Sequence, residues 1–265
     1  MKKRLIKPAL YLGIPALIAV VVFFIPSRIQ EIFVLKMDHL TLWNWFTYIF
    51  VHENLPHLVR NIIFSFIPVI TAFFICSKRE RNFFHRPFLW VLVLTPFISL
   101  IITILIWKVG GILLLNHRGF SGITSAGIGL LGFFIAKRIY NKWNIKNKAI
   151  LLQLCYFILI PSLAIMAWNL SKILSIFSFA LWILMIFNLF FVLKKDNVAI
   201  DTSKWDYKEV SVICFSLIVL FVGALLLVPE NLVNENGSVV NAIAHLIGFI
   251  VGFWTYFVWD LQTES

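Results

Sequence analysis

Residues 119–136 have the sequence GFSGITSAGIGLLGFFIA, which contains no charged side chain and five glycines. A segment this apolar indicates a helix buried in protein or lipid. The apolar run 121–136 would rise only about 24 Å, less than the ~30 Å of a bilayer's hydrocarbon core. We therefore expect this helix to begin below the membrane surface, with the glycine-containing connection 108–118 dipping inward to meet it.

The composition of the whole chain is that of a membrane protein. Its 265 residues are 61% hydrophobic, 16% aromatic and 13% charged, with a mean hydropathy of +0.93. A water-soluble domain carries about 25% charged residues, and disorder requires low hydrophobicity, so both classes are excluded. Continuous apolar runs also argue against a transmembrane β-barrel. The net charge of +11 then indicates basic cytoplasmic loops, and we expect no nucleic acid partner.

Eight apolar runs, most of them close to the length that crosses a bilayer, follow one another along the chain. They cover residues 8–26, 55–76, 87–107, 121–136, 149–168, 170–193, 209–228 and 238–258. No linker or internal repeat separates them. The sequence therefore predicts a single all-α, polytopic membrane domain over residues 1–265.

The distribution of Lys and Arg predicts the orientation. With eight helices and the N-terminus inside, 17 of the 23 Lys and Arg residues fall on the inner side, as the positive-inside rule requires. Both termini are then cytoplasmic, and the first run is a retained helix. The aromatic stretch 27–54 lies outside, along the membrane interface. The setting we expect is a multi-pass protein of a prokaryotic plasma membrane.

Three polar sites interrupt the apolar runs, and polar groups inside a membrane are by default functional. Asn61, one turn after His57, lies 15 residues from the inner end of its run, Ser121 also 15, and His245 13. These separations correspond to heights of ~22, ~22 and ~20 Å above the inner boundary. Three remote parts of the chain therefore place polar side chains at one level.

This combination predicts acyl-transfer chemistry. A serine at a helix start could simply cap the helix, but it could also act as a nucleophile beside N–H groups that favour an oxyanion. In that interpretation His245 is the base for Ser121, and Asn61 and His57 supply the oxyanion site. No carboxylate lies in a helix core near this level, so an acid-completed triad is not expected and a Ser–His dyad without a metal remains.

Small residues predict close packing between the serine and histidine runs. Ala244, Gly248 and Gly252 form a small-xxx-small stripe, and small-residue stripes let helix backbones approach closely in lipid. A candidate facing stripe on the serine run consists of Gly122, Ser125, Gly129 and Gly132.

Three motifs, in this order, resemble those of the rhomboid family of intramembrane serine proteases. They are His57-x-x-x-Asn61, Gly119-x-Ser121-Gly122 and Ala244-His245-x-x-Gly248-x-x-x-Gly252. The resemblance implies that Ser121 is the nucleophile, His245 the base, and Asn61 and His57 the oxyanion site. It also implies cleavage of transmembrane protein substrates within the lipid bilayer, without cofactor.

The chain departs from the family pattern in three ways. The family core has six helices, so two of the eight form an inserted hairpin at about 149–193, and 209–228 matches the gating helix. The first outer loop lacks the Trp-Arg pair often found there. Ser125 stands where a tyrosine often stacks on the histidine.

Alternatives remain on the same residues. A rhomboid-like scaffold that binds or escorts membrane proteins could use this fold without chemistry. A metalloprotease needs HExxH, and here His57 comes one residue too late after His52. An aspartyl protease needs paired carboxylates in the membrane, and the apolar runs hold none. A transporter needs a polar path across the whole membrane, and the inner halves of the runs are apolar. We expect the remaining histidines, His39, His52, His85 and His117, to lie near the membrane interfaces and to be solvated or to snorkel there. The cysteines, Cys76, Cys155 and Cys214, are expected to fill the core.

Overall fold

The computed structural model describes residues 2–36, 41, 43–110, 116–145, 147–167, 172–196, 198, 205–227 and 242–264. Eight long helices form one bundle: α1 Lys2–Phe24, α4 Leu55–Ile75, α6 His85–Gly110, α7 Ser121–Lys142, α8 Lys148–Ala167, α9 Lys172–Lys195, α10 Tyr207–Leu226 and α11 Ala242–Glu264. The short elements are α2 Ser27–Gln30, β1 Leu35–Lys36, α3 Asn44–Thr47, the 3₁₀ turn η1 Tyr48–Phe50, α5 Lys78–Phe83 and β2 Asn116–His117.

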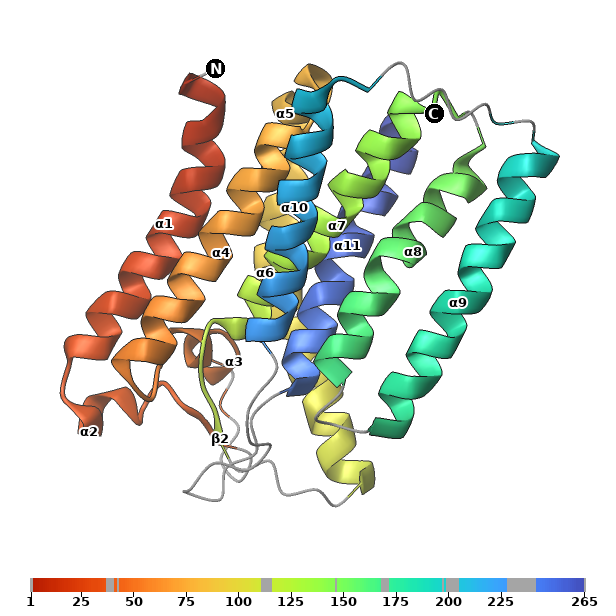
Figure 1. Cartoon of the computed structure of the whole chain (residues 1–265). Coiled ribbons are helices and arrows are strands. Elements are labelled where there is room, and N and C mark those ends of the chain that lie inside the picture. Colours follow the sequence, from red (N-terminus) through yellow and green to blue (C-terminus); the bar gives the residue numbers. More distant parts are fainter. Residues whose placement is uncertain are drawn as a thin grey trace.

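The protein is an all-α, polytopic membrane protein. Within the described residues, seven helices (α4 and α6–α11) are long and apolar enough to span a bilayer, and α1 adds a shorter apolar helix, Leu10–Phe24. The chain begins and ends at the same end of the bundle (Figure 1). We call this the terminal end, and the opposite end the loop end.

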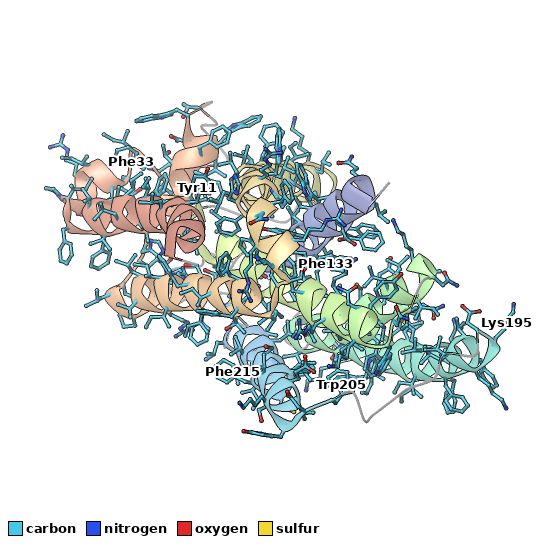
Figure 2. The ribbon with its side chains drawn as sticks, turned by 90° about the horizontal axis from the view of Figure 1, so that it is seen from above. Tyr11, Phe33, Phe133, Lys195, Trp205 and Phe215 are labelled. Carbon is cyan, nitrogen blue, oxygen red and sulfur yellow. The ribbon has the colours of Figure 1, made fainter. Side chains whose placement is uncertain are left out.

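The centre of the bundle is α7, which packs against α4, α6, α8, α10 and α11. Of its span 83% is buried, against 6% for α9, which lies at the edge of the bundle beside α8 (Figure 1). Viewed along the bundle, Phe133 of α7 lies near the middle, with Phe33 and Lys195 towards opposite edges (Figure 2). The glycine-rich sequence of α7 is therefore that of the core helix.

The length predicted for α7 is wrong. The helix continues to Lys142 and has 22 residues, enough to span by length. The helix continues past Ala136 because Lys137 is not left in the apolar core without a partner. Its side chain is 3% exposed, and its Nζ lies 2.7 Å from Asp260 Oδ2 on α11. The preceding helix, α6, reaches Gly110, and residues 111–115 of the predicted inward dip lie outside the described residues.

The loop-end segment between α1 and α4 packs onto the bundle. Its strand β1 pairs with β2 in the connection before α7, with Leu35 opposite His117. Val34, Tyr48, Ile49 and Val51 are buried, whereas Trp43 and Phe46 are about half exposed. The prediction that the cysteines fill the core holds for Cys76 and Cys155 but is wrong for Cys214, which is exposed on the outer face of α10.

Candidate active site

The start of α7 is held in place by the loop-end segment. Gly119 has φ +106°, a conformation that favours glycine, and its N–H donates to the carbonyl of Tyr48 at 3.0 Å. The helix then begins at Ser121, which is 8% exposed. The N-cap residue is Phe120 and no side chain caps the helix. Ser121 therefore does not serve as the cap.

The first and second motifs meet at Gly119. A Cβ added there would lie 3.1 Å from His57 Cε1 and 3.7 Å from Asn61 Nδ2, both on α4. The hydroxyl of Thr124, one turn into α7, also donates to the backbone carbonyl of Asn61 at 3.1 Å. The Asn61 side chain and the N-terminus of α7 are thus neighbours, although they are 60 residues apart in the chain.

The expectation that His52 is solvated is wrong. This residue is 2% exposed, and its Nε2 accepts hydrogen bonds from Asn61 Nδ2 at 3.2 Å and from the Phe120 N–H at 3.4 Å. Its Nδ1–H donates to the Phe50 carbonyl at 3.3 Å. Burial lowers the pKa of His52 to about 4, with His57 nearby acting in the same direction. The neutral ring therefore joins the loop, α4 and the start of α7.

His52 gives the site a testable dependence on pH. Because its pKa is lower in the folded state than the ordinary 6.5, its contribution to stability is present above pH 6.5 and is lost as the pH falls towards 4. The loss amounts to at most about 3 kcal/mol. We expect the melting temperature of the detergent-solubilised protein to fall over this range.

Two variants separate this effect from other titrations. His52→Gln keeps an acceptor near the Nε2 position, so it should flatten the pH dependence while retaining most of the stability at pH 8. His52→Leu leaves the Asn61 amide and the Phe120 N–H without their acceptor and should cost about 2 kcal/mol. A His52→Gln profile that parallels the wild type would show that another group causes the loss.

The second and third motifs meet where α7 packs on α11. A Cβ added to Gly248 would lie 2.1 Å from the Gly122 carbonyl oxygen, and one added to Gly122 would lie 3.5 Å from the Ala244 carbonyl oxygen. The hydroxyl of Ser125 donates to the His245 carbonyl at 2.5 Å. Where the rhomboid pattern often has a tyrosine, this chain uses a fully buried serine to bind the backbone of the histidine.

The two small-residue stripes face each other over most of their length. Gly252 lies against the Ala126 carbonyl and Gly129 against that of Phe249, with distances of 2.0 and 1.9 Å from the added Cβ atoms. Gly132 departs from the expected stripe, because it faces Leu159 of α8 and Leu220 of α10.

The ring of His245 is oriented by the end of α10. Its Nδ1 lies 2.8 Å from the carbonyl oxygen of Leu227, which can only accept, so Nδ1 carries the proton and Nε2 of the neutral ring keeps its lone pair. A backbone carbonyl thus takes the position that a carboxylate occupies in an acid-completed triad. Within the described residues, no hydrogen bond joins Ser121 Oγ to this ring.

A small cavity borders Ser121, Gly122 and Ala244. Its volume is about 10 Å³, which is about what one water molecule needs. Two hydroxyls of α6, Thr95 and Ser99, also line it. Both are 1% exposed, and neither has a hydrogen-bond partner within the described residues. The site therefore has a polar, water-sized space directly beside the serine.

The other predicted positions are less informative. His85 is half-buried, while His39 and the side chain of His117 lie outside the described residues. Sequence reasoning missed His52, Thr95, Ser99 and the Leu227 carbonyl. Only the first had a signal, because His52 lies nine residues before Asn61 in the block that precedes α4.

Comparison with known proteins gives no relative: no family model, curated protein or solved structure matches the chain.

Proposed function

We propose that this protein is an intramembrane serine endopeptidase of the rhomboid type, in which Ser121 and His245 form a catalytic dyad. The proposal rests above all on the contact between Gly122 and Gly248. Because Ser121 precedes Gly122 directly and His245 is one turn before Gly248, this contact supports a hydroxyl and an imidazole at one level of the bundle.

In the proposed reaction, Ser121 Oγ attacks the carbonyl carbon of the scissile peptide while its proton passes to His245 Nε2. The oxyanion accepts hydrogen bonds from the N–H groups at the start of α7 and from Asn61, whose Nδ2 has a second proton besides the one donated to His52. The C–N bond breaks as His245 protonates the leaving amine. Water then attacks the ester while giving a proton to His245, and the C–O bond to Ser121 breaks as His245 returns that proton to Oγ, which releases the acid product and restores both side chains.

The finer features of the fold belong to the same proposal. Trp182 of α9 donates to the Phe157 carbonyl of α8 and Ser175 to the Ala164 carbonyl, whereas most of the large apolar side chains of α9 are exposed. This arrangement supports an α8–α9 hairpin added to a six-helix core. We further propose that the terminal end faces the cytoplasm of a prokaryotic cell, since the basic segments lie there and both termini share that end (Figure 1).

Proteoliposomes containing a fluorescent transmembrane segment as substrate test the proposal. The wild type should cleave the segment, and His245→Ala should lower kcat by at least about 10³-fold while still binding it. The rival function, a scaffold that binds membrane proteins, predicts that wild type and His245→Ala both bind the segment and that neither cleaves any segment of a diverse set. That result would favour the scaffold.

A further inference from the structure

A second cavity, larger than the one beside Ser121, opens at the terminal end of the bundle. It has a volume of about 190 Å³, below the ~300–1,000 Å³ of pockets that enclose drug-sized ligands. Residues of α5 and its N-cap Ser77, of the start of α6, and of the last turns of α7 and α11 surround it. It therefore lies at the opposite end of α7 from Ser121, and the proposed peptidase activity does not use it.

Both signs of charge line this cavity. Lys137 and Asp260 form a largely buried ion pair across one wall, and Arg79 and Glu80 of α5 line another. Glu80 is fixed by a capping box, because its Oε2 accepts from the Ser77 N–H at 2.6 Å. The lining thus offers two cations and two carboxylates. Because these charges balance, the lining suits a ligand that carries both signs of charge better than a simple anion or a simple cation.

The remaining walls are aromatic and include one unsatisfied donor. Phe133, which lies near the middle of the bundle (Figure 2), packs here with Tyr256 at 6.3 Å between ring centroids. The indole Nε1–H of Trp259 is buried and has no hydrogen-bond acceptor within the described residues, although its side chain lines the cavity. A buried donor without an acceptor is costly, and an acceptor oxygen on a bound molecule would remove that cost.

We propose that this cavity binds the head group of a phospholipid that carries both a phosphate and a primary ammonium group, from the leaflet at the terminal end. The phosphate matches Arg79, Lys137 and the Trp259 N–H, and the ammonium matches Asp260 and Glu80. The small volume fits a head group, and the aromatic walls suit the level of a membrane interface. A purely anionic head group would match the two cations but would offer no cation to the carboxylates of Asp260 and Glu80.

Delipidated protein in detergent tests the assignment by thermal unfolding. Phosphatidylethanolamine should raise the melting temperature by about 3 °C or more. Two control lipids should each give less than half of that rise. Phosphatidylcholine has a quaternary ammonium that cannot donate hydrogen bonds, and phosphatidylglycerol has no ammonium. Equal shifts from the three lipids, or a larger shift from phosphatidylglycerol, would overturn the proposal. The proposal would also be overturned if soluble phosphoethanolamine reproduced the full shift in melting temperature, because the ligand would then be a free solute and not a lipid.

Matched variants place the lipid in the cavity. Trp259→Phe removes the buried donor and should abolish most of the phosphatidylethanolamine shift, whereas Trp254→Phe makes the same change on an exposed position of α11 and should retain it. Asn141→Leu, at the cavity wall, should also reduce the shift and gives a second reading if Trp259→Phe folds poorly. If Trp259→Phe and Asn141→Leu respond like the wild type, the lipid binds elsewhere and the inference is wrong.

Discussion

Ser121→Ala should abolish proteolysis, lowering kcat for a transmembrane substrate by at least about 10³-fold. Removing the nucleophile leaves only the residual rate that oxyanion stabilisation and binding can support. The fold should survive, because Ser121 does not cap α7 and its hydroxyl makes no hydrogen bond within the described residues. We expect an unchanged melting temperature and unchanged binding of the substrate segment.

A serine one turn away provides the matched control. Ser125 is fully buried and binds the His245 carbonyl rather than facing the cavity beside Ser121. Ser125→Ala should therefore cost about 1 kcal/mol of stability and leave most of the activity. Cleavage by Ser121→Ala at the wild-type rate would end the peptidase interpretation.

Gly248→Val should prevent the protein from accumulating in its folded state. Even one methyl group at this position would lie 2.1 Å from the Gly122 carbonyl oxygen, and that oxygen belongs to the backbone of the central helix. No rotamer change relieves such a contact, so α7 and α11 must separate. Overpacking typically costs 1–3 kcal/mol, and we expect more than about 3 kcal/mol here because a rigid backbone is displaced.

The milder substitution Gly248→Ala makes this prediction measurable when the valine variant does not fold. It should lower the melting temperature and reduce cleavage, because the same separation moves His245 away from Ser121. Gly13→Ala in α1 is the control, since nothing lies within 4 Å of the Cβ it would add. A Gly248→Ala protein as stable as Gly13→Ala would contradict the close helix contact.

The sequence predicts the helices well because their apolar runs are long and uninterrupted. The runs at 55–76 and 209–228 match α4 and α10 to within two residues at each end. The error at the end of α7 arises because Lys137 looks like a boundary in the sequence. Only the fold reveals that Asp260, 123 residues later, pairs with this lysine and keeps the turn helical.

Predicting the site required different information for different residues. Ser121, Asn61 and His245 are visible in the sequence as polar interruptions for which counting along the apolar runs predicts one height, and the small residues near Ser121 and His245 predict which helices touch. His52 escaped this reasoning because it precedes α4 in a polar segment, where solvation is the ordinary expectation. The partner of His245 was not predictable, because a backbone carbonyl such as that of Leu227 leaves no trace in the choice of side chain.

The most direct test of the central claim is to locate the adduct of a fluorophosphonate probe by peptide mass spectrometry. We predict a single modified residue, Ser121, in the wild type, and loss of the adduct in His245→Ala because the hydroxyl then lacks its base. An adduct on another serine, or undiminished labelling of Ser121 in His245→Ala, would contradict the dyad.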